Sequence, residues 1–241
     1  MKYSIIIPTL NEEKLLPKLL KILTADKIKN NFDYEIIISD GGSKDKTIEI
    51  GREFDASIVN NVGSELNISK GRNQGADSAK GDILIFFNAD VIPEDFNKLM
   101  TTVEKKFIGS NYYAMTCNVE VFPSERKFVD LVFQTFYNNY FHALNVIGMG
   151  MGRGECHIIS KKVFEEFNGY NETIIAGEDF DLFRRIRKKG KIFFARNLVV
   201  YESPRRYRKY GHFRILFTWL INSIYIVLGN SSKSTEWEAV R

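Results

Sequence analysis

The chain has 241 residues, of which 44% are hydrophobic and 27% are charged, and its formal net charge is +4. This length supports a well-buried core, and the composition excludes a disordered or low-complexity protein. Lysine and arginine crowd between Arg184 and Arg214, so the C-terminal third is basic and suited to phosphates, nucleic acid or an anionic membrane surface.

The first half of the chain alternates short apolar runs with amphipathic stretches. The runs "YSIIIP", "YEIIISD", "ASIV" and "DILIFFN" predict strands at 3–8, 34–40, 56–59 and 82–88, and the stretches between them predict helices. Apolar runs without alternation, spaced by helices, are typical of a parallel sheet that is covered on both faces. We therefore expect an α/β fold in which ligands bind beyond the carboxyl ends of the strands.

Polar and turn-forming residues gather at these predicted strand ends. They are Pro8, Thr9, Asn11 and Glu12 after the first strand, Asp40 and Gly41 after the second, Arg72 before the fourth, and Asn88, Ala89 and Asp90 after it. Taken singly, such residues are explained as helix caps, turns or solvated charges. Because the carboxyl ends of parallel strands meet at one edge of the sheet, together they predict a binding site.

Asp90 ends the fourth apolar run, and a buried carboxylate is costly unless it is paired, hydrogen-bonded or bound to a metal. One interpretation makes Asp90 the N-cap of the next helix, with Pro93 in the first turn of that helix. The other interpretation makes Asp90 a ligand-binding group. This stretch alone leaves both open.

The second half is less regular. Residues 111–122 predict a strand, 125–146 a long aromatic-rich helix, and "CHIISKKVFEEFNGYNE" a strand, a short helix and a turn. "GEDFDLFRRIRKKG" predicts a helix closed by Gly190. The segment "GMGMGRGE" lacks the spacing of the dinucleotide fingerprint and predicts a mobile loop that lines a cleft. With no repeat or low-complexity linker, we expect one compact domain with a C-terminal tail.

The cysteines and the two ends of the chain suggest a location. Cys117 and Cys156 form no Cys-x-x-Cys pair, which argues against a disulfide framework and a cysteine-based zinc site. The N-terminal "MKYSIIIPTLNEE" holds too short an apolar run for a signal peptide. We therefore expect a cytoplasmic protein, with a peripheral contact at the inner face of the membrane through residues 205–228.

The apolar stretch from Ile215 to Leu228 has two interpretations. It either packs on the predicted helix 125–146 and completes the core, or it lies in the membrane plane with a basic cluster upstream meeting anionic lipid. It falls short of the roughly 20 residues that a membrane-spanning helix needs.

The segments "SIIIPTLNEE", "IISDGGSKDKT", "GRNQGADSAKGDILIFFNAD" and "AGEDFDLFRRIRKKG" occur in this order. The ordered set resembles glycosyltransferase family 2 over most of the chain, from residue 3 to residue 210. The resemblance implies the GT-A fold, a Rossmann-like, mainly parallel sheet flanked by helices, here with a C-terminal helical tail. It implies that residues 1–110 bind a nucleotide sugar, that 111–205 bind the acceptor as the other half of the same domain, and that 206–241 form the tail.

The resemblance also implies roles at the donor side of the site. Thr9, Asn11 and Glu12 would lie against the nucleoside. Asp40 would accept a hydrogen bond from the base, which is most often uracil in this family, and Arg72 would lie near the base and the diphosphate. The neighbouring donor-site residues would be Pro8, Gly41 and Ala89.

A metal site is implied as well. Asn88 and Asp90 stand where the family usually has Asp-x-Asp, whose last carboxylate binds a divalent metal that bridges the donor diphosphate. Oxygen ligands favour Mn²⁺ or Mg²⁺. The amide of Asn88 removes one negative charge from the motif, which lowers the expected metal affinity. His212 is a further candidate ligand, because some relatives use a C-terminal histidine.

The general base of the family belongs to a Glu-Asp pair, which here is Glu178–Asp179, so Asp179 is implied to take the acceptor's proton. The like charge of Glu178 would raise the pKa of Asp179. The other interpretation is a helix N-terminus with acidic residues that suit its dipole. A single base without a carboxylate nucleophile implies one displacement with inversion. The residues expected to contact acceptor or phosphate are Gly152, Gly154, Glu178, Arg205 and Arg206.

We therefore expect a metal-dependent inverting glycosyltransferase that moves a sugar from a nucleotide-diphosphate donor, UDP-linked, to an acceptor hydroxyl or a lipid phosphate in cell-envelope biosynthesis. One alternative is a catalytically weak nucleotide-sugar-binding protein, which Asn88 favours. The other is a nucleic-acid-binding protein that uses the basic segments "RRIRKKGK" and "SPRRYRKYGHFR".

Overall fold

The computed structural model describes residues 2–25, 31–60, 67–229 and 231–233. Within these residues the strands form a single eight-stranded sheet in the order β3-β2-β1-β4-β7-β6-β8-β5. The strands are β1 (Tyr3–Thr9), β2 (Tyr34–Asp40), β3 (Ser57–Asn60), β4 (Ile83–Phe87), β5 (Val91–Pro93), β6 (Tyr112–Val121), β7 (Cys156–Ser160) and β8 (Lys191–Glu202).

The sheet is mixed but mostly parallel. Strands β1 to β4 run parallel, β7 runs antiparallel to both β4 and β6, and β8 is parallel to β6 and antiparallel to β5. The carboxyl ends of β1, β2, β4, β6 and β8 therefore lie at the same edge of the sheet as the amino end of β7. The predicted α/β fold with a mainly parallel sheet is confirmed.

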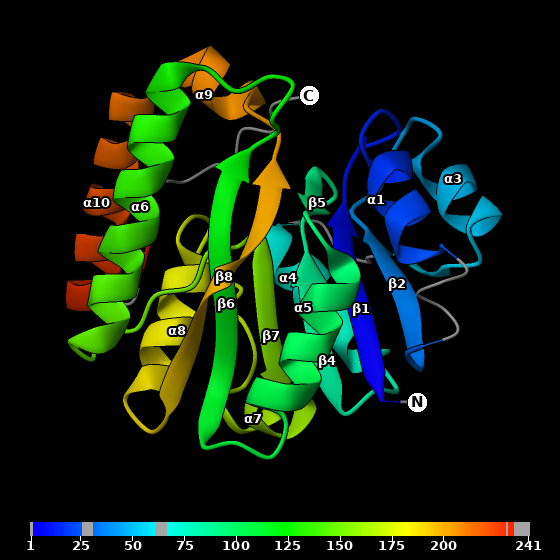
Figure 1. Cartoon of the computed structure of the whole chain (residues 1–241), viewed down its shortest axis with the longest axis horizontal. Coiled ribbons are helices and arrows are strands. Elements are labelled where there is room, and N and C mark those ends of the chain that lie inside the picture. Colours follow the sequence, from blue (N-terminus) through cyan, green and yellow to red (C-terminus); the bar gives the residue numbers. More distant parts are fainter. Residues whose placement is uncertain (1, 26–30, 61–66, 230, 234–241) are drawn as a thin grey trace.

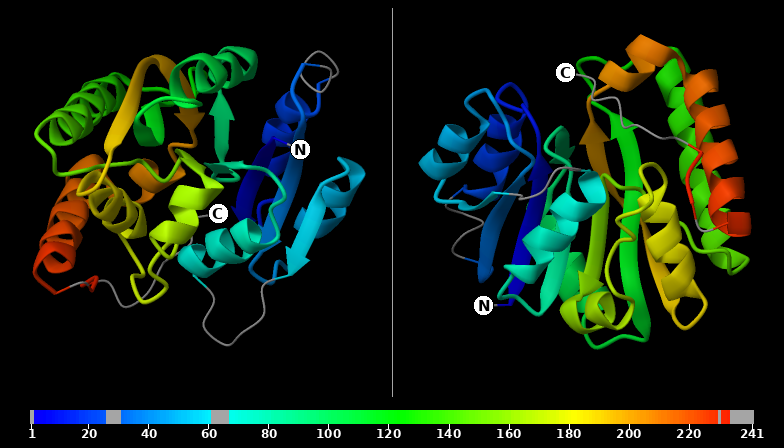
Figure 2. Two further views of the ribbon diagram at one scale, coloured as in Figure 1. Left: turned by 90° about the horizontal axis from the view of Figure 1, so that it is seen from below. Right: turned by 180° about the vertical axis from the view of Figure 1, so that it is seen from behind.

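Helices cover both faces of the sheet and one end of it (Figures 1 and 2). They are α1 (Leu16–Leu23), α3 (Thr47–Glu53), α4 (Ile68–Asp77), α5 (Phe96–Thr102), α6 (Phe128–Val146), α7 (Lys161–Glu166), α8 (Glu178–Arg187), α9 (Arg205–Tyr210) and α10 (His212–Gly229). A π-helical turn at Val103–Phe107 extends α5. Figure 1 shows α6 and α10 side by side beyond β6.

The unbroken apolar runs reflect burial on both sides of the sheet. Ile5 and Ile7 of β1 belong to the core under α1 and α5, whereas Ile6 between them belongs to the core formed with α4, α7 and α8. A third cluster joins the end of the sheet to α6, α9 and α10 through residues such as Tyr137 and Ile215. A central strand therefore needs apolar side chains at every position.

Several local expectations are corrected. Asp95, and not Asp90, is the N-cap of α5, because its side chain accepts a hydrogen bond from Lys98 N at 2.8 Å. Pro93 lies in β5 instead of a first helical turn. Strands β5 and β8 were not predicted, and the register of β6 against β8 is irregular between Cys117 and Asn118.

Three other expectations concern the division of the chain, its cysteines and the end of α8. One sheet contains strands from both sides of residue 110, in keeping with two halves of one domain. The assignment of donor binding to one half and acceptor binding to the other stays a prediction. Cys117 and Cys156 are free and buried on the neighbouring strands β6 and β7, and a contact with Cys117, together with burial, raises the pKa of Cys156. The turn after α8 closes through Gly190, whose N–H donates to Ile186 O at 2.9 Å, as predicted.

Helix α10 combines features of the two interpretations of the apolar tail. It packs on α6, where Trp219 lies 5.2 Å from the ring of Tyr137 and 6.3 Å from that of Phe141. At 18 residues and a mean hydropathy of 1.3, it is the one described helix long and apolar enough to cross a membrane by length and composition, and only 22% of it is buried. The expectation that this segment is too short for such a helix is therefore corrected.

Candidate active site

The ends of β1 and β2 are joined by hydrogen bonds around one carboxylate. Asp40 is buried, and its two oxygens accept hydrogen bonds from Thr9 Oγ1 at 2.9 Å, from the backbone N–H groups of Gly42 and Ser43 at 2.9 and 2.8 Å, and from Ser43 Oγ at 2.5 Å. Gly41 N donates to Thr9 O at 2.8 Å. These bonds fix the backbone of both strand ends.

The loop after β1 is attached to the loop after β2. Asn11 has φ 54°, in the left-handed region that asparagine tolerates better than most residues. Its Oδ1 accepts a hydrogen bond from Lys44 N at 2.8 Å, and its own N–H donates to Ser43 Oγ at 2.8 Å. Asn11 is therefore a bridge between two strand ends and does not cap α1, which begins at Leu16.

Arg72 links three segments of the site. It lies on α4, and its side chain is 1% exposed. Its guanidinium donates to Glu178 Oε1 at 2.7 Å, to Asn88 Oδ1 at 2.9 Å and to Gly154 O at 2.9 Å. Burial acts to lower the pKa of Arg72, but nearby Tyr170 and Glu178 more than offset this and raise it.

Asp179 is the second residue of α8, and two N–H groups hold its carboxylate. Gly154 N donates to Oδ2 at 3.0 Å, and Phe180 N donates to Oδ1 at 2.8 Å. Burial, followed by the charge of Glu178, raises the pKa of Asp179 to about 7, while Arg72 acts in the opposite direction. The rise was predicted from Glu178 alone, whereas burial is the larger cause. A carboxyl group with this pKa is suited to proton transfer near neutral pH.

The glycine-rich segment before β7 is exposed at Gly148 and Met149 and then packs into the protein, and the mobility expected of it stays a prediction. Residues 150–154 are buried. A Cβ on Gly152 would lie 2.6 Å from His157 Nε2, and a Cβ on Gly154 would lie 2.9 Å from Arg72 Nη2. The glycines let this backbone pass close to α8 and place the Gly154 peptide between Arg72 and Asp179.

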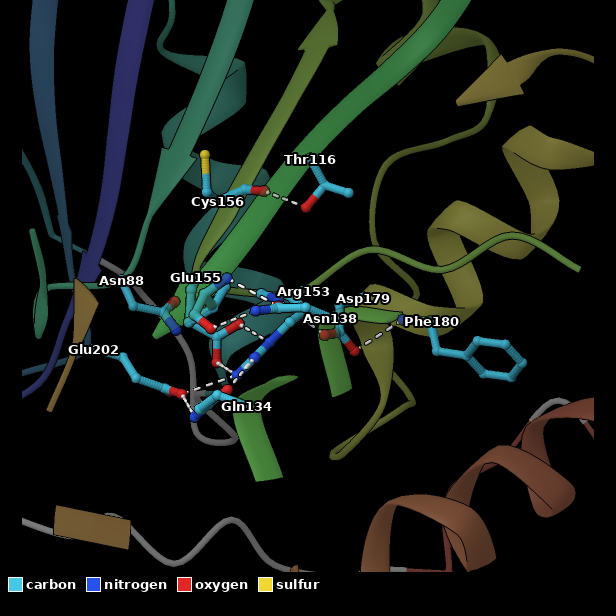
Figure 3. Close-up of polar contacts among 12 residues, drawn as sticks. Asn88, Thr116, Gln134, Asn138, Arg153, Glu155, Cys156, Asp179, Phe180 and Glu202 are labelled. Carbon is cyan, nitrogen blue, oxygen red and sulfur yellow. Dashed lines mark hydrogen bonds and ion pairs between the residues drawn. The ribbon is translucent and has the colours of Figure 1, made fainter. Parts of the chain in front are cut away.

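Sequence reasoning missed a buried polar cluster beside Asp179, which Figure 3 shows. Arg153, only 2% exposed, donates to Glu202 Oε1 at 2.9 Å and to Gln134 Oε1 at 2.7 Å, and it pairs with Glu155 at 3.3 Å. Tyr207 Oη also donates to Glu202 Oε1, at 2.8 Å. These residues come from α6, the segment before β7, the end of β8 and α9. No local sequence motif therefore predicts the cluster.

The pKa values of the two carboxyl groups of this cluster are shifted in opposite directions. Burial raises the pKa of Glu202 to about 8, although Arg153 lowers it, and the charge of Glu155 raises it further. Burial also acts to raise the pKa of Glu155, but Arg153 outweighs this and lowers it. These opposite shifts favour the protonated form of Glu202 and the charged form of Glu155 at neutral pH.

Asp90 and Glu12 share one arginine. Arg205 Nη2 lies 3.0 Å from Asp90 Oδ2 and 2.7 Å from Glu12 Oε1, and Nη1 lies 3.1 Å from Glu12 Oε2. Ser203 N also donates to the backbone oxygen of Asp90 at 3.1 Å. The structure thus brings Arg205, expected on the acceptor side, into contact with two residues expected on the donor side. Arg206 follows it on α9 and is partly exposed.

His212 is buried at the start of α10. Its Nε2 lies 2.7 Å from Asp130 Oδ1, and its ring stacks on Phe133 and Tyr207 at centroid distances of 4.5 and 4.4 Å. Burial acts to raise the pKa of Asp130, but hydrogen bonds, that from Arg208 first, lower it well below its usual range. Nε2 of His212 is thereby hydrogen-bonded to Asp130. The role of His212 as a metal ligand stays a prediction.

The sequence has relatives of known activity. The family model described as Glycosyl transferase family 2 matches residues 4–167. An undecaprenyl-phosphate 4-deoxy-4-formamido-L-arabinose transferase of Pseudomonas fluorescens is 37% identical over 112 residues, which cover 43% of this chain and 33% of that protein. A 4,4'-diaponeurosporenoate glycosyltransferase of Staphylococcus haemolyticus is 42% identical over 93 residues, which cover 36% of this chain and 24% of that protein. The chain therefore spans about a third or less of these relatives.

Solved structures share the fold. The mannosyltransferase PcManGT of Pyrobaculum calidifontis, in complex with GDP-Man and Mn²⁺, has a TM-score of 0.67 at 18% identity, covering 84% of this chain and 56% of that one. Glucosyl-3-phosphoglycerate synthase of Mycobacterium tuberculosis, in complex with Mn²⁺, UDP and phosphoglyceric acid, has a TM-score of 0.65 at 16% identity, covering 94% and 77%. The fold is GT-A, as the resemblance implied. Because the family model matches more than half of its length, the chain belongs to glycosyl transferase family 2.

Proposed function

We propose that this chain is a metal-dependent, inverting glycosyltransferase that moves a sugar from a nucleotide-diphosphate donor, UDP-linked, to an acceptor hydroxyl or a lipid phosphate. The observation that carries the proposal is Asp179. Its carboxyl group has a pKa of about 7 and lies beside Arg72, which also contacts the end of β4. A proton acceptor therefore lies at the sheet edge where the family binds its donor.

The loops of the donor side are preorganised by hydrogen bonds within the protein. The hydrogen bonds of Asp40 and Asn11 fix the loops after β1 and β2, so the nucleoside would meet a surface that needs little ordering. Arg72 lies below this edge in contact with Asn88. Its Nη1 and Nη2 atoms donate to protein acceptors, so it supports the site from beneath and need not touch the diphosphate.

The proposed reaction is a single displacement. The acceptor oxygen bonds to the anomeric carbon, the bond from that carbon to the diphosphate oxygen breaks, and the hydroxyl proton passes to the carboxylate of Asp179. Gly154 N–H holds Oδ2 of Asp179 and so fixes the direction of the carboxylate. A lipid phosphate would attack as an oxyanion, in which case no proton needs to be removed.

The carboxylates present fit a hard divalent cation. Asp90 and Glu12 already lie against one positive group, the guanidinium of Arg205. Among the described residues, no three His, Cys, Asp or Glu side chains cluster to hold a metal. Mg²⁺ and similar ions commonly bind one or two carboxylates plus substrate phosphates, so Asp90 and the donor would suffice. When bound, the metal offsets negative charge that develops on the leaving diphosphate.

The test is a panel of UDP- and GDP-linked sugars in thermal unfolding experiments with and without Mn²⁺. A ligand that binds only the folded state raises the melting temperature. We expect the largest shift for a UDP-sugar with Mn²⁺, followed by transfer with inversion as seen by NMR of the product anomer. If no nucleotide shifts the melting temperature, the proposal fails. Binding without turnover with any acceptor would favour the weak binding protein instead.

We further propose that the chain works on an anionic lipid surface, against which the outer faces of α6 and α10 rest. Large apolar side chains are exposed on both helices, which lie side by side in Figures 1 and 2. They include Phe128, Val132, Phe136, Phe217, Ile224 and Leu228. An apolar surface of this extent on a soluble protein marks an interaction site.

Charge favours lipid over a second protein copy as the occupant. The only acidic residue in α6, α9 and α10 is Asp130, which is buried and paired with Arg208. Lys209 and Arg214 are exposed beside the apolar faces, and each basic residue near an anionic surface contributes about 1 kcal/mol. The predicted role of Arg205 and Arg208 in this contact is weakened, because both form ion pairs with carboxylates. The same pairs reduce the charge available for nucleic acid.

Flotation with anionic liposomes tests this surface. The full chain is expected to float at low ionic strength and to float less with neutral liposomes. Protein that stays in the soluble fraction as a dimer, measured by light scattering, would make a second copy the occupant and contradict the lipid proposal. The cytoplasmic location expected from the sequence stays a prediction.

A further inference from the structure

The position of Arg205 affects how a divalent cation and a nucleotide diphosphate can bind at the donor site. Arg205 lies just after β8 and is 193 residues distant in the sequence from Glu12. Its Nη2 contacts both Glu12 Oε1, at 2.7 Å, and Asp90 Oδ2, at 3.0 Å. Both carboxylates are thus within hydrogen-bond distance of a single nitrogen atom. Side-chain exposure is 6% for Glu12 and 21% for both Asp90 and Arg205.

Two carboxylates this close together repel each other unless a cation lies between them, and burial strengthens the repulsion. Arg205 supplies that cation. Its contacts with Glu12 and Asp90 outweigh the effect of burial and raise its own pKa, so it stays charged at any pH at which the protein is folded. The guanidinium therefore lies against the carboxylate to which the proposed function assigns the metal.

We propose that Arg205 is an internal counter-cation of the donor site, which holds Glu12 and Asp90 until a divalent cation and a nucleotide diphosphate replace it. The inference rests on the proposed function, because it takes Asp90 as the metal ligand. Metal and guanidinium compete for the same carboxylate oxygens, so the metal alone binds weakly. A diphosphate removes the competition, because its oxygens accept the planar fork of Arg205 in a bidentate manner.

This arrangement makes metal and nucleotide binding cooperative. Each ligand favours the state in which Arg205 has left Asp90, so each increases the affinity for the other by the same factor. Without donor, Arg205 would offset one of the two negative charges, and the carboxylates would take up the metal only together with the leaving group whose charge it offsets. An arginine at this position thereby couples metal loading to donor loading.

The test measures Mn²⁺ binding directly, from the electron paramagnetic resonance signal of free Mn²⁺ at low ionic strength without nucleotide. Arg205→Ala is expected to bind Mn²⁺ about tenfold or more tightly than the parent, because an opposing charge a few ångströms away is removed. Arg205→Lys retains a cation and should stay close to the parent. Lys209→Ala removes the same charge from the same helix α9 and should change the affinity by less than about twofold.

One further variant and one measurement with UDP test whether Asp90 and the diphosphate account for the change in Mn²⁺ affinity. Asp90→Asn in the Arg205→Ala background should return Mn²⁺ affinity to the parent value or below. Saturating UDP should reduce the difference between parent and Arg205→Ala, because Arg205 then contacts the diphosphate. Melting temperatures of all variants establish that they are folded, and Arg205→Gln, which also removes the charge, serves if Arg205→Ala is not.

The outcomes separate this inference from the proposed function. Equal Mn²⁺ affinities in parent and Arg205→Ala, with UDP-dependent Mn²⁺ binding that still needs Asp90, would overturn the role of Arg205 and leave the proposed function intact. If the Mn²⁺ affinities of parent and Arg205→Ala still differ tenfold with saturating UDP, Arg205 does not move from Asp90 to the diphosphate, and that part of the inference is overturned. Tightened Mn²⁺ binding in Arg205→Ala, together with no binding of any nucleotide, would instead overturn the proposed function.

Discussion

Arg72 on α4 and Glu178 at the start of α8 form an ion pair, 2.7 Å between Nη1 and Oε1, although they are 106 residues apart in the sequence. Their side chains are only 1% and 7% exposed. The same guanidinium contacts Asn88 and Gly154. One buried side chain thus ties the donor-side strand end to the helix that carries Asp179.

The first prediction follows from this burial. Arg72→Met is expected to lower the free energy of unfolding by about 3–5 kcal/mol, because it leaves the carboxylate of Glu178 buried without its partner. Denaturant titration measures the loss. Lys188→Met at the C-cap of α8 is the control, since Lys188 is exposed and should change stability by no more than about 0.5 kcal/mol. Equal effects of the two substitutions would contradict the structural role of Arg72.

The second prediction concerns Asp179 in turnover. Asp179→Asn should lower kcat by about 10²–10⁴-fold and leave donor affinity nearly unchanged, because the base acts on the acceptor. In the parent, kcat should fall below pH 7, where Asp179 becomes protonated. A hydroxyl acceptor requires this dependence, whereas a lipid phosphate attacks as an oxyanion and should give little loss in Asp179→Asn. The variant thus reports the acceptor class, and loss of UDP binding would assign Asp179 to the donor side.

The third prediction concerns the effect of Asp179 on the pH dependence of protein stability. Because the pKa of Asp179 is raised from 3.8 to about 7 on folding, the folded state binds more protons than the unfolded state between these values. The contribution of Asp179 to stability is therefore present at low pH and is lost as pH rises toward 7. Asp179→Asn should be more stable than the parent near pH 8 and should gain less on acidification to pH 5. Parallel pH profiles in urea unfolding would show an unperturbed carboxyl group.

Much of the donor half could be predicted from the sequence, because its signals are local. Strands such as 34–40 are unbroken apolar runs, and Asp40 ends its strand next to glycine. The hydrogen bonds of Asp40 come mainly from the following three residues. Here the fold and the site arise from the same short segment.

The rest depends on contacts between distant segments. Arg205 was expected to contact acceptor, phosphate or anionic lipid, and nothing within its own helix indicates that Glu12 and Asp90 surround it. Strand β8 contains Arg196 and Asn197, both exposed, where the register with β6 shifts, so its apolar pattern is broken. Arg153 and Glu202 meet only when α6, β8 and α9 are assembled.

The fourth prediction concerns that buried cluster. Glu202→Gln should stay within about 1 kcal/mol of the parent at pH 7, because the raised pKa of Glu202 favours its uncharged form and an amide oxygen can still accept the hydrogen bonds. Arg153→Met should lose about 3–5 kcal/mol, since Glu155 keeps its charge without the partner. Denaturant titration compares the two. A larger loss for Glu202→Gln than for Arg153→Met would show that Glu202 is the charged member of the pair.

The fifth prediction separates the core role of α10 from its outer face. Truncation after Tyr210 should give insoluble or unfolded protein, because Ile215 and Ile226 are buried and Trp219 packs on Tyr137. Truncation therefore cannot test membrane contact by itself, and substitution of exposed residues is the sharper experiment. Phe217 and Leu228 are 61% and 82% exposed, so replacing both by serine should leave the melting temperature nearly unchanged.

In the same variant, Phe217→Ser with Leu228→Ser, flotation with anionic liposomes should fall at least about tenfold, because fully burying a side chain of this size in an apolar phase contributes about 1.5–3 kcal/mol. The matched control is Thr218→Ala with Lys188→Ala, since Thr218 is exposed on α10 and Lys188 is exposed at the C-cap of α8. That control should float like the parent. If both double variants float equally well, the outer face of α10 does not enter the lipid, and the apolar surface must serve another contact.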